Sequence, residues 1–489
     1  MNNLLSKMPQ KCWAYTALSI WAALCFILLH KTSYGIDERA AQALLLIWSI
    51  ADNVVSPIVT LGFPDFRAVF LAPVGFLWTG EVLPAKVATI IVMAIATWAV
   101  HAWRLHKGES ESSLLATGLL LISPSILLQI DTISVAAFLL FSFALGTWAD
   151  HIYRGSPKVF GGMYFSQLFL CFVTITLHPI GIAYPLALLW TWYKAPLDKK
   201  QQIYYFCGIG AVAFMALSLT LGWGHLVWLV NPVKSLSSLL LGVPLDDEFG
   251  LFRWLAGISI LVVLLLVIWK NALTLWADLL GRTLLIGLAI GIFVGDDIFG
   301  ITALTVCLYW GLPSLLNLST HPQGGFWRQR GFVLILTVFL ATICMFSNKL
   351  RYQTLQSNDL SPRDSLIKVL AEDSGLFSID DPSRATSVKK PIRVASQWPA
   401  LTMLACRCDA LPLPPPYAKD SEELYTMLNG INFLIFDPHD LDNASLARNL
   451  ATMEAGRTET IILQKGGVIV QVKTPLAAPM PKQIAPSKS

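Results

Sequence analysis

Charged residues are scarce in this chain. Only 13% of its 489 residues are Asp, Glu, Lys or Arg, while 55% are hydrophobic. A typical soluble domain carries about 25% charged residues, so water would solvate this chain poorly and most of it is expected to lie in lipid. The 17 Trp and 25 Phe agree with this expectation, because aromatic side chains gather in membrane spans and at their interfaces.

The motifs of nucleotide-driven and hydrolytic enzymes are also missing. The sequence has no P-loop, no dinucleotide-binding glycine fingerprint, no zinc-binding His-Glu-x-x-His and no Gly-x-Ser-x-Gly elbow. Most of the eight cysteines lie in apolar runs, where Cys behaves as a small hydrophobic residue. The remaining pair, Cys406 and Cys408, supplies too few ligands for a metal site. A cytosolic nucleotide-driven machine is therefore disfavoured, and membrane-embedded acids and bases remain as candidates.

The apolar runs predict an all-α polytopic membrane domain over residues 1–349. A helix needs about 20 apolar residues to cross a bilayer, and on that measure the chain holds about eleven spans. The first run lacks a small-residue cleavage motif and is interpreted as a retained span rather than a signal peptide. Residues 31–83 are predicted to form a long first outer loop whose short apolar stretches lie against the membrane. The expected spans are 12–30, 84–103, 113–130, 132–149, 160–177, 179–193, 203–222, 250–269, 273–294, 298–317 and 332–348.

The basic residues predict the orientation, because cytoplasmic loops carry an excess of Lys and Arg. With the amino terminus inside, the inner segments hold Lys7, Lys11, Arg104, Lys107, Arg154, Lys158, Lys194, Lys199, Lys200, Lys270, Arg328 and Arg330. The outer loops then hold only Lys31, Arg39, Arg67 and Lys234. We therefore expect a multi-pass protein of the inner (plasma) membrane with its carboxyl end outside the cytoplasm.

From about residue 350 the composition becomes that of a soluble protein. Residues 350–473 are predicted to form a small extracytoplasmic α/β domain, and residues 474–489 a disordered tail. Strands are expected at 392–396 and 431–436, with a closing hairpin at 460–464 and 468–472. Helices are expected at 398–405, 421–429 and 441–453, and a Pro-rich loop at 411–416.

Several short motifs follow one another along the predicted outer segments of the chain. Gly35-Ile36-Asp37-Glu38-Arg39 follows the first span, and Pro64-Asp65-Phe66-Arg67 lies in the long loop before Ala72-Pro73-Val74. Ser123-Pro124 precedes Asp131, and Thr176-Leu177-His178-Pro179-Ile180-Gly181 comes later. This order resembles the C-type glycosyltransferase superfamily, which includes protein O-mannosyltransferases and the lipid A aminoarabinose transferase.

The resemblance implies a function as well as a fold. Enzymes of this superfamily transfer a sugar from a polyprenyl-phosphate carrier at the outer membrane face. The expected activity is therefore transfer of a hexosyl- or pentosyl-type sugar to an extracytoplasmic acceptor. The implied partners are the lipid-linked donor, membrane lipids and a glycan, lipid or protein acceptor, and no nucleic acid is expected. The resemblance leaves a divalent cation open as a cofactor.

The resemblance also assigns roles to residues. Asp37 takes the place of the catalytic base, which would accept a proton from the attacking hydroxyl, and Glu38 stands beside it. The alternative is that Asp37 caps a helix that begins at Arg39. Asp65 and Arg67 resemble an acid–base pair of the family, although the Pro-Pro-Leu turn that normally follows is absent. Arg67 would bind the lipid phosphate through paired hydrogen bonds, or it contacts ordinary headgroups.

Three further sets of residues remain candidates. Asp131 matches an acid that follows a Ser-Pro kink in the family, and the resemblance implies that it orients the acceptor or, as in some members, binds a metal. The alternative is a solvated helix start. His178 stands where relatives place a phosphate-binding base, or it is structural. The acids Asp246-Asp247-Glu248 and Asp296-Asp297 could bind a divalent cation, although solvated loop charge is the favoured interpretation.

Two rival functions stay open. A transporter or flippase of a lipid-linked substrate would need polar residues at the centres of several spans or an inverted repeat. A catalytically inactive scaffold would explain the departures from the family pattern around Pro73. Asp278 and Arg282 are spaced four residues apart inside a predicted span, and they are expected to neutralise each other on one helix face.

Overall fold

The computed structural model describes residues 10–51, 66–155, 161–194, 199–220, 250–294, 297–314, 326–357, 360–373, 393–414, 420–438, 440, 443–453, 457–462 and 467–472. The chain divides into two compact units. The first unit comprises Met1–Thr32, Leu46–Asn53 and Gly62–Asp359, and the second comprises Ser33–Leu45, Val54–Leu61 and Leu360–Ser489.

The first unit is built from helices. They are α2 (Gln10–Ile27), α4 (Arg67–Leu77), α5 (Leu83–His106), α6 (Ser110–Ile122), α7 (Pro124–Asp131), α8 (Val135–Gly155), α9 (Gly162–Leu177), η2 (Pro179–Ile182), α10 (Ala183–Lys194), α11 (Lys199–Thr220), α13 (Gly250–Ala277), α14 (Leu279–Val294), α15 (Asp297–Val306), η4 (Cys307–Gly311) and α17 (Phe326–Gln356). Helix α3 (Glu38–Ala51) begins in the second unit and ends in the first.

Among the described residues, three helical segments are long and apolar enough to cross a bilayer. They are Leu83–His106, Val135–Arg154 and Gly257–Ala277. Ser112–Ile122 and Pro124–Asp131 form a pair bent by 53°, which makes a fourth span if the pair is counted as one. Several predicted spans fall partly outside the described residues, so the expected total of about eleven stays a prediction.

Outward-facing apolar side chains support a lipid surrounding. On α13, the Trp269 and Leu273 side chains are 81% and 87% exposed. Water does not tolerate extended apolar faces of this kind, whereas lipid tails do.

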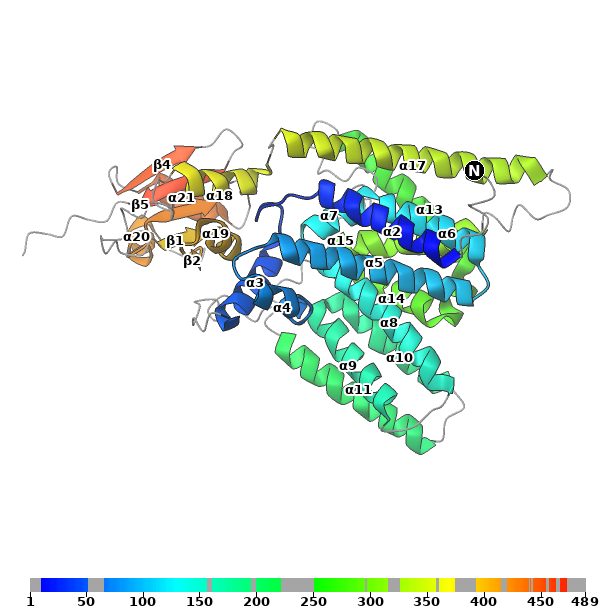
Figure 1. Ribbon diagram of the computed structural model, residues 1–489. Coiled ribbons are helices and arrows are strands. Elements are labelled where there is room, and N and C mark those ends of the chain that lie inside the picture. Colours follow the sequence, from blue (N-terminus) through cyan, green and yellow to red (C-terminus); the bar gives the residue numbers. More distant parts are fainter. Residues whose placement is uncertain are drawn as a thin grey trace, which may run out of the picture. The chain divides into compact units, whose positions relative to one another are not determined.

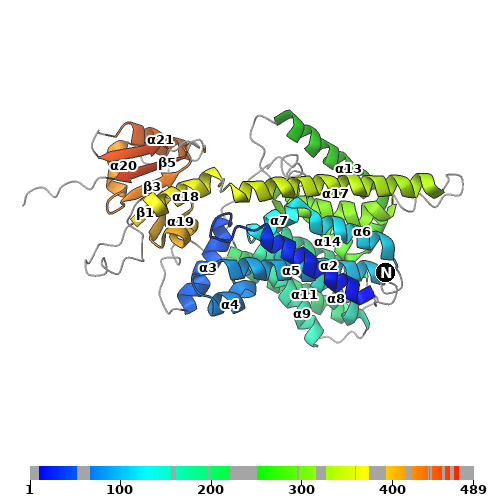
Figure 2. The same cartoon turned by 45° about the horizontal axis from the view of Figure 1, so that its top comes forward.

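Helix α5 lies at the centre of the first unit, packed against both α8 and α2 (Figures 1 and 2). The long α17 runs beside α6 and α7 (Figure 2). Close packing of α8 and α10 depends on Gly146, because a Cβ there would lie 2.4 Å from the Tyr184 ring. The Tyr184 hydroxyl also donates a hydrogen bond to Gln167 of α9, which joins three helices in the core.

A break in the chain at Ser123 positions Asp131. Residues that precede proline are pushed into extended backbone, and Ser123, which precedes Pro124, has ψ of 130°. The helix therefore stops at Ile122, restarts at Pro124 and ends at Asp131. The Ser-Pro kink expected from the sequence is confirmed.

The second unit contains a five-stranded mixed sheet in the order β2-β1-β3-β5-β4. The strands are β1 (Arg393–Ser396), β2 (Asp409–Pro412), β3 (Phe433–Phe436), β4 (Thr458–Ile462) and β5 (Val468–Val472). The β1 strand pairs in parallel with β2 and β3, whereas β5 is antiparallel to both β3 and β4. Its helices are α18 (Pro362–Asp373), α19 (Pro399–Cys406), α20 (Ser421–Met427) and α21 (Ala444–Ala451).

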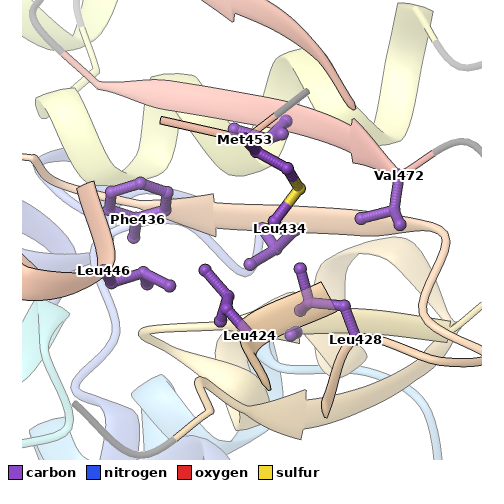
Figure 3. Close-up of a cluster of buried hydrophobic side chains, with 9 residues drawn as sticks. Leu424, Leu428, Leu434, Phe436, Leu446, Met453 and Val472 are labelled. Atoms are coloured by element: carbon purple, nitrogen blue, oxygen red, sulfur yellow. The ribbon is translucent and has the colours of Figure 1, made fainter. Parts of the chain in front are cut away.

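The core of this unit lies between the sheet and two helices. Figure 3 shows Leu424 and Leu446, from α20 and α21, beside Leu434 and Phe436 of the central strand β3. All four side chains are at most 5% exposed. The predicted strands, helices and hairpin of this region are confirmed within a few residues. The sequence failed to predict α18 and β2.

Candidate functional site

A buried charged cluster surrounds Asp131 at the carboxyl end of α7. The Asp131 side chain is only 2% exposed. Its Oδ1 accepts a hydrogen bond from Lys86 Nζ at 2.8 Å, and its Oδ2 accepts one from Arg351 Nη2 at 2.6 Å. His30 contributes twice, through its backbone N–H at 3.0 Å and through ring Nδ1 at 2.5 Å. Both oxygens of the carboxylate are therefore engaged.

The cluster brings together four distant parts of the first unit. Lys86 lies in the first turn of α5 and Arg351 in α17, while His30 follows the end of α2. The two cations also bind the chain just after α2. Lys86 Nζ donates to His30 O at 2.9 Å, and Arg351 Nε donates to Leu28 O at 3.3 Å. These contacts fix the positions of α2, α5, α7 and α17 around one carboxylate.

The cluster carries excess positive charge. Lys86 and Arg351 alone contribute two positive charges against the single negative charge of Asp131. The Lys86 side chain is fully buried, whereas those of Arg351 and His30 remain 10% and 25% exposed. Charges in a low-dielectric interior are weakly screened, so an anion that approaches His30 and Arg351 would be attracted.

Arg67 supports the turn that follows Asp131. Its Nη1 donates a hydrogen bond to Ile133 O at 2.8 Å, and the residue is 1% exposed. Ile133 has φ of +52°, a conformation that β-branched residues rarely adopt, so this turn needs such support. The structure thus places Arg67 and Asp131 at one turn. The role of Arg67 in phosphate binding stays a prediction.

His178 lies at a helix boundary within the first unit. Its Nδ1 accepts a hydrogen bond from Ile180 N at 3.2 Å and so caps η2. The side chain is buried at 5% exposure. Gly181 in the same turn leaves no room for a side chain, because a Cβ there would lie 1.7 Å from Thr174 O. The contact described is structural, and phosphate binding by His178 stays a prediction.

Asp37 and Glu38 belong to the second unit, at the start of α3. Asp37 is partly exposed, and its carbonyl accepts the first helical hydrogen bond from Ala41 N at 3.0 Å. Both carboxylate oxygens of Glu38 are occupied by the backbone N–H groups of Ala400 and Leu401, at 2.7 and 3.1 Å. Burial raises the pKa of Glu38 to about 7, and the charge of Asp37 adds to the effect. Both acids are partly exposed, and Glu38 is engaged in a structural contact.

Within the described part of the chain, no three His, Cys, Asp or Glu side chains are grouped closely enough to hold a metal ion. Asp65, Asp246, Asp247, Glu248 and Asp296 lie outside the described residues. A divalent cation and a role for Asp65 therefore stay predictions.

Sequence reasoning found Asp131 but missed its three basic partners. The available signal was Lys86, a cation inside an apolar helix, because ionised groups in a membrane span are costly without a partner. Asp131 was the acid that could pair with Lys86 and neutralise its charge. His30 and Arg351 gave no local signal, since each lies at the end of an ordinary apolar run.

No protein-family model matches the sequence, and no curated protein matches it. Solved structures do match. The chain is similar to ArnT from Cupriavidus metallidurans bound to undecaprenyl phosphate, with a TM-score of 0.52 and 11% identity over 96% of this chain and 100% of that one. The apo form of the same ArnT gives a TM-score of 0.53 and 11% identity over 96% and 99%. An oligosaccharyltransferase from Archaeoglobus fulgidus aligns at 0.49 and 11% identity over 86% and 67%.

The chain shares the fold of the ArnT structures. The likeness to ArnT extends over nearly the whole of both chains, so it includes the membrane helices and the small sheet domain alike. The fold implied by the resemblance is confirmed. At 11% identity, substrate and residue roles do not follow from the likeness.

Proposed function

We propose that this chain is a membrane glycosyltransferase that takes a sugar from a polyprenyl-phosphate donor. The buried cationic cluster around Asp131 is the observation that carries the proposal. A lipid phosphate is an anion that must be held at the membrane surface, and Arg351 and His30 are the less buried members of a cluster with excess positive charge. The whole-chain likeness to an ArnT structure with bound undecaprenyl phosphate supports the same class of ligand.

In the proposed reaction, an acceptor hydroxyl attacks the anomeric carbon of the donor sugar. The hydroxyl proton passes to the Asp37 carboxylate, a new carbon–oxygen bond forms, and the bond from the anomeric carbon to the phosphate oxygen breaks. Polyprenyl phosphate leaves with the bonding electrons. Positive charge near that phosphate lowers the barrier, because negative charge develops there in the transition state. Arg67 is proposed as an additional phosphate contact.

A binding experiment tests the cationic cluster. Purified protein in nanodiscs should bind undecaprenyl phosphate, and Arg351→Gln should weaken that binding by about tenfold, the loss expected for one charge-assisted hydrogen bond. Lys349→Gln is the matched control, since Lys349 lies on the same helix and outside the Asp131 cluster. Equal affinity in all three proteins would contradict the proposed phosphate site.

The transporter alternative makes a different prediction. A flippase would move the lipid-linked sugar across the vesicle membrane without consuming it. The buried charges of Lys86, Asp131 and Arg351 inside the helical unit are the observation that keeps this function in view. Translocation of intact donor, with no sugar transferred to any acceptor, would favour the flippase.

A further inference from the structure

The backbone on the amino-terminal side of Asp37 is held by α18. Gly35 N donates a hydrogen bond to Asp364 Oδ2 at 3.1 Å, and Arg363 Nη2 donates one to Ile36 O at 3.0 Å. Asp364 is only 4% exposed, and Gly35 has φ of +81°, which favours glycine. The Ile36 side chain is fully buried. The chain is therefore fixed immediately before Asp37.

The residue on the other side of Asp37 is held by α19. Glu38 accepts hydrogen bonds from Ala400 N and Leu401 N, two of the N–H groups that the first turn of a helix leaves unpaired. An acidic group at this end of a helix also interacts favourably with the helix dipole. Both contacts lie within the second unit. Asp37 thus stands between two anchors that the carboxyl-terminal part of the chain provides.

We propose that Arg363, Asp364 and Glu38 are positioning residues that hold the Asp37 carboxylate in the geometry needed to accept the acceptor proton. The inference rests on the proposed glycosyltransferase function and gives the sheet domain a specific task in it. Proton transfer requires the base within hydrogen-bond reach of the hydroxyl, and a displacement of about 1 Å can lower the rate by about 10²-fold.

The hydrogen bonds also separate the roles of the two neighbouring acids. Both oxygens of Glu38 already accept backbone N–H groups, so this side chain serves as an anchor. Asp37 is partly exposed and lies between the anchors. Because Glu38 is committed to these two hydrogen bonds, the proposal assigns the proton transfer to Asp37.

A pair of substitutions at Asp364 tests the inference. Asp364→Ala removes the acceptor for Gly35 N, and we expect kcat for sugar transfer to fall by at least about tenfold while the donor KM changes less than about twofold. Asp364→Asn keeps an oxygen acceptor and should restore most of kcat. Arg457→Ala is the control, since it removes an ion pair with Glu422 elsewhere in the same unit and should leave kcat unchanged.

Hydrogen exchange gives a readout that does not depend on activity. Asp364→Ala and Glu38→Gln should each speed amide exchange over Gly35–Glu38 and leave exchange in β3 unchanged. Unchanged kcat together with faster exchange would overturn the inference, because the segment would then be loose without effect on transfer. If exchange responds as expected but the wild-type protein transfers no sugar, the anchors stand and the proposed function is wrong.

Discussion

Asp131→Asn removes the only negative charge from the cluster while keeping nearly the same shape. Four hydrogen bonds now end on this carboxylate, from two atoms of His30 and from the Lys86 and Arg351 side chains. Asparagine keeps one acceptor oxygen and places an N–H₂ group among these donors. The fully buried Lys86 ammonium would then lack a counter-charge.

The structure gives the size of the expected effect. Leaving one partner of a buried ion pair uncompensated costs about 3–5 kcal/mol, which is roughly two to four decades in the ratio of folded to unfolded protein. Asp150→Asn is the matched control. Asp150 is as buried as Asp131, but its partner Arg154 has a side chain 52% exposed and can turn to water. We expect Asp150→Asn to be the milder substitution.

The measurement is the unfolding free energy of each variant in detergent micelles, followed by tryptophan fluorescence. Adding Lys86→Met to Asp131→Asn should recover part of the loss, because the fully buried ammonium that lost its counter-charge is then removed as well. The coupling should fall within about 0.5–3 kcal/mol. The reasoning is refuted if Asp131→Asn is no worse than Asp150→Asn, or if the two cluster substitutions are simply additive.

The remaining predictions concern three other positions. Burial raises the pKa of Glu38 from 4.5 to about 7, so between these pH values the folded chain keeps a proton that the unfolded chain releases. The free energy of unfolding should therefore fall as pH rises from 4.5 to about 7. Glu38→Gln should flatten this part of the curve of unfolding free energy against pH. Gly181→Ala would bring a Cβ within 1.7 Å of Thr174 O and should lower the melting temperature, whereas Gly210→Ala, with open space, should not; equal melting would contradict this. Arg67→Lys should weaken donor binding because Lys lacks the planar fork, and unchanged affinity in both this variant and Arg67→Ala would assign Arg67 to structural support alone.

The strands and helices of the carboxyl-terminal region were predictable because each is indicated by residues within its own segment. Alternating apolar residues on either side of a pair of adjacent glycines in the sequence predicted the β4–β5 hairpin without knowledge of its neighbours. The β2 strand was missed because Pro412 and Pro414 made its segment look like a loop. It occupies the edge of the sheet, where proline is tolerated. Only the tertiary arrangement identifies such a strand.

The Asp278–Arg282 pairing was predicted wrongly for a related reason. Spacing of four residues brings side chains together only on a continuous helix, but the chain breaks at Asp278, between α13 and α14. Asp278 instead accepts hydrogen bonds from Trp103 Nε1 at 3.0 and 3.2 Å. Arg282 donates to Thr191 Oγ1 at 2.6 Å.

The Asp131 cluster shows the limit of sequence reasoning most clearly. Its partners stand 101, 45 and 220 positions away along the chain. Apolar periodicity gives the face of a helix that is buried, but it gives neither the rotation nor the vertical register between helices. Both are needed to tell that Lys86 and Arg351 meet the same carboxylate.

Sugar transfer by the purified chain tests the central claim most directly. The protein in nanodiscs is given a radiolabelled polyprenyl-phosphate sugar and envelope acceptors, and release of free polyprenyl phosphate is measured together with labelled product. Loss of a general base typically lowers the rate by about 10²- to 10⁴-fold, so Asp37→Asn should fold normally, still bind donor, and lose at least about two decades of activity. Full activity in Asp37→Asn, or an intact donor pool with the wild-type protein, would contradict the account.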